Sequence, residues 1–379
     1  MAAWGSGGTP KRSVPEYFGD GIPWLSISDL NDGVVCNAKE SLTHLGVENS
    51  SAKIVPKGSI LVAMYGSIGK LGVAGRELCT SQAIAFAKPN TEVTHPRYLF
   101  HFLLAQRPKL QARGRGGTQM NIGQGDLKAW KIPLPPLGEQ RRIAAILDQA
   151  DAILAKRRVV VDQVDALARS IFLDMFGDPD SAAKVISFGK VARLEGGRNV
   201  VASDPNVASK HRVIKISAVT SGIFRPQESK PLPANYDPPS NHFVRQGDLL
   251  MSRANTTELV GAVAHVQQTP KNLVLPDKVW KFQWLCKGSV PEFYYALFRS
   301  RSIRNKISRL SSGTSGSMKN VSKAKLSSML IPDISLAEQE EFARRSKSVS
   351  AQRAVAQRAL DRDNELFASL QSRAFRGEL

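Results

Sequence analysis

The side chains best suited to contact a ligand fall in polar loops at equivalent places in two halves of the chain. In the first half they are Tyr65, Ser67, Lys70, Arg113, Arg115, Thr118, Gln119 and Asn121; in the second they are Arg253, Asn255, Thr256, Thr257, Ser315, Ser317, Lys319 and Asn320. Arginine pairs with guanine and asparagine or glutamine with adenine in the major groove of DNA, whereas lysine and serine hold phosphates. For any one of these residues, a turn former or a solvated charge is an equally good interpretation. The grouping, rather than any single member, predicts a DNA-binding surface.

Motifs of catalysis are missing from the sequence. It contains no Walker lysine loop, no GxGxxG after a strand, no GxSxG and no HExxH. Residues 236–240 (YDPPS) are similar to the motif with which amino-group DNA methyltransferases stack a flipped base, but Ser240 has no ring, so a proline turn is the better interpretation. Residues 228–230 resemble half a nuclease motif and are interpreted as a solvated charge cluster. The cysteines and histidines lack the close spacing of zinc sites. We therefore predict a non-catalytic chain without a metal site or a cofactor of its own.

The positive charge is concentrated in two segments. The formal net charge is +19 at pH 7. Residues 1–138 contain 15 Lys and Arg against 9 Asp and Glu, and residues 179–337 contain 23 against 10, whereas the segment after each is nearly neutral. Because neutralised phosphates release counterions, this distribution favours a nucleic-acid partner. The alternative is a basic protein kept soluble by its charge, and the confinement to two segments argues against it.

Composition bounds the size and compartment of the protein. A chain of 379 residues, 42% of them hydrophobic, has room for two or three domains with their own cores. The first eight residues contain no apolar core of a signal peptide, and no run reaches the roughly 18 apolar residues of a membrane span. We therefore expect a cytoplasmic protein.

A long amphipathic helix is predicted directly after a proline-rich lead at residues 132–137. Pro133, Pro135 and Pro136 keep this lead extended, and nothing breaks a helix from Glu139 until Gly177. Apolar residues recur at steps of three and four along one face, with a gap at Arg157. About 38 residues at a rise of about 1.5 Å make a rod of roughly 55 Å, whose apolar seam requires a partner helix.

The chain supplies that partner, because residues 331–339 repeat the lead and residues 338–375 repeat the helix. The second copy is more polar, with Arg353 and Asp363 on the seam. Further equivalences extend the repeat to the whole chain: positions 58 and 247 differ by 189, 96 and 291 by 195, and 139 and 338 by 199. We predict a mixed α/β fold with a pseudo-two-fold internal repeat. It consists of recognition domain 1 (1–137), long helix 1 (138–178), recognition domain 2 (179–336) and long helix 2 (337–379), with the two helices forming an antiparallel coiled coil.

Shorter patterns predict the elements of the first domain. Residues 22–30 alternate as a strand and end at an Asn-Asp-Gly turn, residues 55–65 form a turn and a second strand, and Pro96 begins a helix that extends to Gln106. Residues 113–122 are predicted to form a flexible basic loop. The second domain opens with residues 185–194, for which the first domain has no counterpart, so domain 1 is expected to lack its first element.

Three stretches carry a family resemblance. GSGGTPKRSVPEYFGDGIPWLSISDL, TQMNIGQGDLKAWKIPLPPLGEQRRIAAILDQADAIL and the degenerate second copy resemble the specificity subunit (HsdS-like) of type I restriction-modification systems. The resemblance covers essentially the whole chain. It implies two target recognition domains held apart by two antiparallel helices, each domain reading half of an asymmetric, split DNA site. It also implies partners: two modification subunits that use S-adenosylmethionine to methylate adenine, and a restriction subunit that uses ATP and magnesium.

Two alternatives remain open beside this interpretation. One is an orphan or truncated coiled-coil scaffold that binds DNA without an active complex. The other is a self-contained DNA methyltransferase, which the missing cofactor loop disfavours. The sequence does not give the target bases or the spacer length.

Overall fold

The computed structural model describes residues 1–116, 120–200, 209–313 and 318–379. The chain divides into two compact units: unit 1 comprises Met1–Val159 and Gln357–Leu379, and unit 2 comprises Val160–Ala356. Each unit contains one half of each long helix, α4 (Leu137–Phe176) and α10 (Leu336–Ala374). The four-part domain division expected from the sequence stays a prediction.

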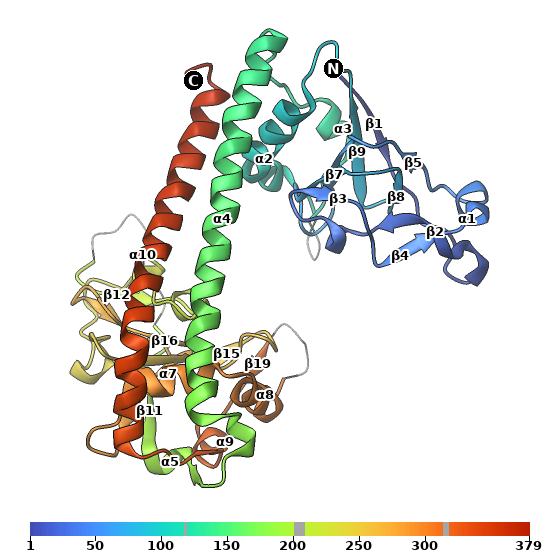
Figure 1. Ribbon diagram of the computed structural model, residues 1–379. Helices are drawn as coiled ribbons and strands as arrows, with labels where there is room; N and C mark the ends of the chain where they lie inside the picture. The colour runs from blue at the N-terminus through green and yellow to red at the C-terminus, as the bar shows by residue number, and fades with distance from the viewer. Residues whose placement is uncertain (117–119, 201–208, 314–317) are drawn as a thin grey trace. The chain divides into compact units, whose positions relative to one another are not determined.

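Unit 1 is built on two sheets (Figure 1). The larger has the order β1-β9-β6-β7-β3, formed by Ala2–Ser6, Ile84–Pro89, Ile60–Ala63, Leu71–Ala74 and Val34–Val35. The smaller has the order β4-β2-β8-β5, formed by Glu40–Leu42, Phe18–Leu25, Leu78–Thr80 and Ile54–Val55. The helices are α1 (His44–Glu48), α2 (Pro96–Arg113) and α3 (Gln124–Lys128), with 3-10 turns η1 (Pro15–Tyr17) and η2 (Ile27–Asp29). Helix α2 packs Leu99, Phe102 and Leu103 into the core beside Ile60 and Val62.

Unit 2 repeats this plan with added elements. Its main sheet has the order β11-β18-β14-β16, formed by Ala192–Gly196, Val279–Trp284, Leu249–Ser252 and Val263–His265. Three smaller sheets are β13-β12-β17 (Ser229–Pro231, Arg212–Ile214, Leu273–Val274), β10-β20 (Val185–Ser187, Leu330–Pro332) and β15-β19 (Ala254–Asn255, Lys319–Asn320). The helices are α5 (Phe188–Val191), α6 (Ser217–Thr220), α7 (Pro291–Arg299), α8 (Arg301–Leu310) and α9 (Lys323–Ser327), with η3 (Pro179–Ser181) and η4 (Ser240–His242).

Strand register confirms the internal duplication. In unit 1 Leu61 pairs with Phe86, and in unit 2 Leu250 pairs with Lys281. The parallel pairs follow the same rule, because Trp24 lies opposite Cys79 and Val213 lies opposite Val274. In both comparisons the first residue of the pair is shifted by 189 positions between the units and the second residue by 195. These are the offsets that the sequence predicted, so the two units share one strand framework.

Two sequence predictions about unit 1 were wrong in extent. The strand expected over 22–30 is β2, which ends at Leu25, and η2 follows it. The η2 turn forms because Asp29 accepts a hydrogen bond from the amide of Ser26 at 2.8 Å. The helix expected to end at Gln106 continues to Arg113 through Pro108, because Leu110 is buried in the core on the far side of the proline. Arg113 is therefore the last residue of a helix rather than part of a loop.

The two long helices predicted from the proline-rich leads are confirmed, and they pair in opposite directions within each unit (Figure 1). In unit 1, Arg142 lies against Leu379 while Arg157 lies against Asp363. In unit 2, Asp165 bonds Arg353, whereas Phe172, further along α4, contacts Phe342 earlier in α10. Rising numbers on one helix meet falling numbers on the other, as an antiparallel pair requires.

The polar residues that interrupt the predicted seam are paired across it. The Arg157 Nε atom donates to Asp363 Oδ2 at 2.9 Å, and the Arg353 guanidinium forms a two-bond contact with Asp165, one bond being 3.0 Å. Arg299 of α7 adds a third charge next to Asp165 at 3.6 Å. A polar residue on the seam therefore selects its partner by charge, which favours one register of the two helices over others.

An aromatic cluster anchors the unit 2 half of α4. Phe172 is 3% exposed and contacts Phe176, Phe293 and Phe342 with ring centroids 5.2, 5.9 and 5.7 Å away. We predict that Phe172→Ala lowers the free energy of unfolding by about 3–5 kcal/mol, because it leaves a cavity among these rings. Leu173→Ala is the matched control, since Leu173 is 51% exposed on the same turn. Urea denaturation measures both, and equal effects of the two variants would contradict the packing described.

The Asp165 to Arg353 pair makes stability depend on pH. Burial raises the pKa of Asp165. Hydrogen bonding by Arg353 and the charges of Arg299 and Arg353 together lower it by a larger amount, so its pKa lies below the usual range. A carboxyl group with a depressed pKa stabilises the fold above its unfolded pKa of about 3.9, and this contribution is lost as the pH falls through the lower folded pKa.

We therefore expect Asp165→Asn to destabilise unit 2 at pH 7 by an amount near the lower end of about 3–5 kcal/mol. The difference from the parent protein should shrink as the pH drops below about 4. Asp162→Asn changes an exposed carboxyl on the same helix and should cost less than about 0.5 kcal/mol. A deficit for Asp165→Asn that stays constant from pH 7 to pH 3 would contradict the charge pairing.

Candidate nucleic-acid interface

In unit 1, the two loops that hold the candidate residues lie side by side. Tyr65 and Arg115 both pair with Asn121. The amide of Gly66 donates to the Met120 carbonyl at 3.0 Å, and the amide of Ile122 donates to the Met64 carbonyl at 2.9 Å. These bonds join residues 64–66, 115 and 120–122 into what we call paired edge 1.

Unit 2 contains the same arrangement. Ala254 and Ser312 both pair with Asn320, through the β15 and β19 strands and a bridge. The amide of Val321 donates to the Arg253 carbonyl at 3.1 Å, which repeats the Ile122 to Met64 bond. Residues 253–255, 312 and 319–321 form paired edge 2. The equivalent bonds show that the two loops meet in one register in both units.

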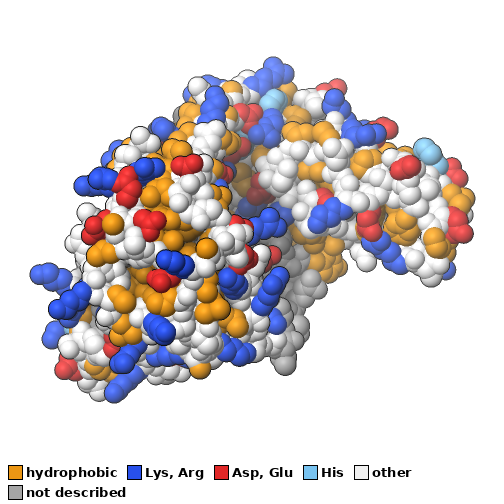
Figure 2. Space-filling view, turned by 60° about the horizontal axis from the view of Figure 1, so that its bottom comes forward, with side chains coloured by type: hydrophobic (Ala, Val, Ile, Leu, Met, Phe, Trp, Pro, Cys, Tyr) orange, Lys and Arg blue, Asp and Glu red, His pale blue; other side chains and the backbone are white. Residues whose placement is uncertain are grey.

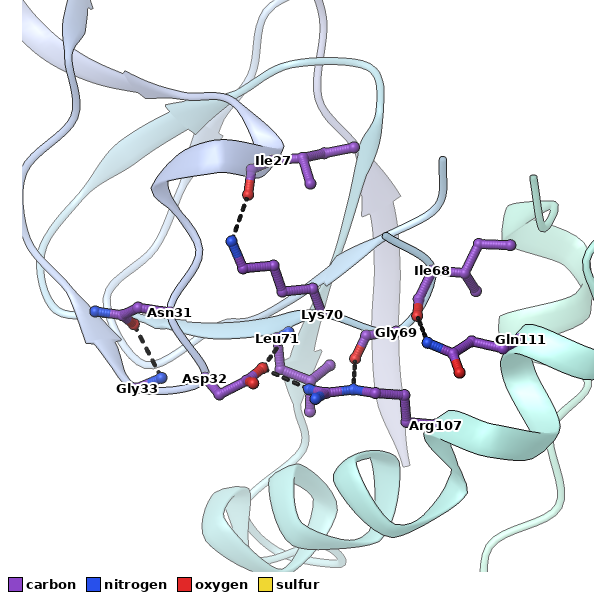
Figure 3. A network of polar contacts seen from close by, with 10 residues as sticks. All are labelled: Ile27, Asn31, Asp32, Gly33, Ile68, Gly69, Lys70, Leu71, Arg107 and Gln111. Carbon is purple, nitrogen blue, oxygen red and sulfur yellow. Dashed lines mark hydrogen bonds and ion pairs between the residues drawn. The ribbon is translucent and has the colours of Figure 1, made fainter. Parts of the chain in front are cut away.

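In unit 1, side chains of helix α2 bond backbone carbonyl groups of the loop that follows residues 64–66 of paired edge 1 (Figure 3). Arg107 Nε donates to the Gly69 carbonyl at 2.8 Å, and Gln111 Nε2 donates to the Ile68 carbonyl at 3.3 Å. A second guanidinium nitrogen of Arg107 bonds the carboxylate of Asp32, which also accepts from the amide of Leu71 at 2.8 Å. We call this set of side-chain contacts the loop clamp.

Unit 2 has a loop clamp at the equivalent positions. Arg304 donates to the Glu258 carbonyl at 2.6 Å, and the Ser308 hydroxyl donates to the Thr257 carbonyl at 3.4 Å. Arg304 differs from Arg107 by 197 residues and Glu258 from Gly69 by 189, the same offsets that relate Ser308 to Gln111 and Thr257 to Ile68. Burial lowers the pKa of Arg304. Both clamps bond backbone atoms of the loop. In unit 1 the loop adds its own constraints, because Gly69 has a φ of +76° and Ile68 is buried in the core.

Some candidate side chains of unit 1 are exposed, whereas others already interact with other groups of the protein. Tyr65 is 39% exposed on paired edge 1, and Arg115 is exposed beside it. Lys70 donates to the Ile27 carbonyl at 3.3 Å, the Ser67 carbonyl accepts from the amide of Lys70 at 3.0 Å, and Arg113 lies 4.9 Å from the Trp130 ring. Asn121 is half-buried at the centre of the edge. Thr118 and Gln119 lie outside the described residues.

The candidates of unit 2 follow the same pattern. Asn255 donates to the Thr220 hydroxyl at 3.4 Å and accepts from the amide of Thr256 at 2.9 Å. Lys319 donates to the Gly313 carbonyl at 3.0 Å, and Arg253 lies 5.9 Å from the Trp280 ring. The Thr257 carbonyl belongs to the loop clamp, and Asn320 occupies the position of Asn121. Ser315 and Ser317 lie outside the described residues.

Positive side chains also line a hollow in unit 2 that the sequence did not predict. Its volume is about 240 Å³, and Arg198, Lys215, Lys230 and Lys278 contribute to its wall. Lys215 is 3.4 Å from Glu228, whose pKa is lowered first by the hydrogen bond from Ser217 and then by the charge of Lys215. Of the predicted charge cluster at 228–230, Lys230 lines this hollow. On the face shown in Figure 2, Lys and Arg side chains are dispersed rather than gathered in one patch.

A buried glutamine in the first turn of each long helix is a positioning residue that the sequence did not identify. Gln140 accepts from the amide of His95 at 2.9 Å and donates to the carbonyls of Val93 and Pro135. Gln339 accepts from the amide of Val290 at 3.4 Å and donates to the Ile334 carbonyl at 2.8 Å. Each glutamine therefore links the start of a long helix by hydrogen bonds to the residue that precedes α2 or α7. The sequence does carry a signal for this role, because the pair Glu-Gln follows the proline-rich lead in both copies of the repeat.

Within the described residues, no three His, Cys, Asp or Glu side chains are placed to hold a metal ion. No helix in the same ranges has the length and apolar character needed to cross a bilayer.

Comparisons with known proteins identify the proteins that this chain resembles. A family model described as "Type I restriction modification DNA specificity domain" matches residues 2–161. The EcoKI specificity subunit of the type I restriction enzyme from Escherichia coli K12 is 25% identical over 398 residues, covering 97% of this chain and 85% of that protein. The chain therefore resembles type I specificity subunits over nearly its whole length, and its residues 2–161 match the specificity domain of that family. The resemblance found in the sequence is confirmed.

Further relatives agree with this assignment. The MjaVIII specificity subunit of Methanocaldococcus jannaschii is 22% identical over 363 residues, covering 90% of this chain and 82% of that protein. The crystal structure of a type I S subunit from M. genitalium superposes with a TM-score of 0.52 at 13% identity, covering 99% of this chain and 93% of that one, which shows a shared fold. The mixed α/β fold with two recognition domains and long helices is confirmed. The scaffold and methyltransferase alternatives are not favoured.

The loop clamp makes a direct prediction about loop motion. Arg107→Ala removes charge-assisted hydrogen bonds to the Gly69 carbonyl and to Asp32, each worth about 1.5–3 kcal/mol. We expect the amides of Gly69, Lys70 and Leu71 to exchange hydrogen about 10- to 100-fold faster. Lys109→Ala is the control, because Lys109 is exposed on the same helix. Unchanged exchange in Arg107→Ala would show that the clamp does not hold the loop.

Proposed function

We propose that this specificity subunit reads a bipartite, asymmetric DNA site, with one half read by the domain of unit 1 and the other by the domain of unit 2. The two paired edges carry the proposal. They have one backbone register and one type of loop clamp, but they present different side chains: Tyr65 and Arg115 in unit 1 stand where Ala254 and Ser312 stand in unit 2. One frame with two sets of donors suits two unequal half-sites.

The charge distribution supports DNA as the ligand. The segment 179–337 carries an excess of 13 positive charges, from 23 Lys and Arg against 10 Asp and Glu, and the basic hollow lies within it. Cations of this kind bind phosphates and fix the position of a domain on the duplex, while the donors on the edges distinguish bases. The exposed Tyr65 and Arg115, the half-buried Asn121 and Asn320, and the other candidates named above are proposed DNA contacts.

The long helices are proposed to set the length of the unread spacer between the half-sites. Helix α4 is continuous over 40 residues and α10 over 39, and each contributes to both units. A continuous helix converts its residue number into length at about 1.5 Å per residue. The paired charges on the seam favour one register of the two helices and would therefore keep the spacer constant.

Catalysis is proposed to belong to other chains. The printed names of the relatives are those of specificity subunits of type I restriction enzymes. We propose that two modification subunits, which carry S-adenosylmethionine, methylate adenine at the site that this chain selects. A restriction subunit with ATP and magnesium would cleave DNA from the same assembly. This chain would then be a cytoplasmic, non-catalytic subunit without a bound cofactor.

Substitution of one central asparagine tests whether each edge reads one half-site. Asn121→Ala should change the base preference of one half of the selected motif, and Asn320→Ala should change the other half. A bidentate contact to a base contributes about 1–3 kcal/mol, which corresponds to a 5- to 150-fold change in discrimination. Selection from random duplex DNA by the assembled modification complex measures this.

Asn305→Ala is the control, because Asn305 is exposed on α8 and lies outside both edges. A uniform loss of affinity over all sequences would show that the asparagine contacts the DNA backbone and not a base. A change in both halves from a single substitution would contradict the assignment of one half-site to each domain.

A further inference from the structure

In unit 2, the basic hollow adjoins paired edge 2. The amide of Arg253, on the edge, donates to the carbonyl of Lys278, in the wall of the hollow, at 2.9 Å. Trp280 follows on β18, and the centroid of its buried ring lies 5.9 Å from Arg253 Cζ and 5.8 Å from Lys323 Nζ. The edge and the hollow therefore bring together positive groups from distant parts of the chain.

Most cations of the hollow are available to bind an anion. Arg198, Lys230 and Lys278 are exposed, and none of them forms an ion pair with a carboxylate in the part of the chain that the structure describes. Only Lys215 has such a partner, Glu228 at 3.4 Å. Positive groups around one hollow repel one another, and a phosphate group offsets this repulsion because its oxygens accept charge-assisted hydrogen bonds from them.

Unit 1 has neutral or acidic residues at the equivalent positions. By the offsets of 189, 195 and 199, four cations of unit 2 correspond to neutral residues: Lys215, Arg253, Lys278 and Lys323 stand where unit 1 has Ser26, Met64, Ala83 and Gln124. Strand register adds a fifth position, because Glu40 lies opposite Trp24 as Lys230 lies opposite Val213. The positive surface beside the edge is therefore a property of unit 2.

A cation that does lie in this region of unit 1 is already neutralised. Arg12 donates two hydrogen bonds to the Glu40 carboxylate, at 2.6 and 2.8 Å, and lies 4.7 Å from the Phe18 ring. Paired edge 1 has an exposed cation of its own, Arg115, where Ser312 stands in unit 2. The two units therefore differ in the surface next to the edge, rather than in whether the edge itself carries a donor.

We propose that the basic hollow and the cations beside paired edge 2 bind phosphates of the DNA backbone, so that unit 2 holds a duplex of any sequence while unit 1 mainly reads its half-site. The inference rests on the proposed function and adds that the two domains contribute unequally to affinity. Contacts to phosphates release counterions and supply most of the binding to DNA of unrelated sequence. Unit 2 therefore makes the first contact with DNA, and unit 1 discriminates afterwards.

The salt dependence of binding tests this division. Lys230→Gln and Lys278→Gln each remove one exposed cation, and each should lower the slope of log affinity against log salt concentration by up to about 0.9. The decrease should be the same for random and for selected duplexes. Lys287→Gln is the control, because Lys287 is exposed beyond the other end of β18 and should leave the slope unchanged. Fluorescence anisotropy of labelled duplexes with the assembled modification complex measures all three.

Ethylation of single phosphates in the selected duplex locates the contacts. Ethylation should interfere at more phosphates in the half-site whose base preference Asn320→Ala changes than in the other half-site. Combining Lys230→Gln with Lys278→Gln should remove interference in that half only and leave the base preferences of both halves unchanged.

Three results would overturn the inference: salt slopes that match the parent, equal interference in both half-sites, or saturable binding of inorganic phosphate to the hollow while DNA affinity is indifferent to both lysines. Failure of the proposed function is a separate result, namely that neither Asn121→Ala nor Asn320→Ala changes a base preference. The salt slopes on random duplexes still decide in that case whether these lysines bind phosphates.

Discussion

The two paired edges depend on side chains that bond the backbone of the neighbouring loops. In unit 1 Arg107 and Gln111 bond the carbonyls of Gly69 and Ile68, and in unit 2 Arg304 and Ser308 bond those of Glu258 and Thr257. In unit 2 the clamped residues Thr257 and Glu258 are exposed, so their side chains can vary while the carbonyl bonds hold the path of the loop. In unit 1 the clamp holds Gly69, which has a φ of +76°, and Ile68, which is buried in the core, so these two positions are more restricted.

The long helices show how polar residues specify a pairing that apolar residues alone leave open. Arg157 and Arg353 interrupt the seam, yet each meets an aspartate of the facing helix, Asp363 or Asp165. Arg353 and Asp165 are largely buried, and burying a charge is costly unless it is paired, so a shifted register would leave them uncompensated. The pair of Arg157 and Asp363 is more exposed and contributes less. Apolar contacts such as the Phe172 cluster supply the stability, and the ion pairs determine which turns of the two helices meet.

Much of the framework could be predicted from the sequence, because repeats and proline-rich leads are local patterns. The offsets of 189, 195 and 199 reappear in the strand register, and both long helices begin directly after their leads. The loop clamps could not be predicted, since Arg107 and Gly69 meet only through the fold. The extension of α2 past Pro108 was missed for the same reason: burial of Leu110, rather than local propensity, decides it.

Two frames of one design are proposed to read two different halves of a DNA site. The measurement that decides this is a map of methylated adenines in the genome of cells that express this chain with its modification subunits. We expect a split motif, with two unequal specified halves separated by an unspecified spacer of constant length. A continuous motif, or methylation without any sequence preference, would contradict it.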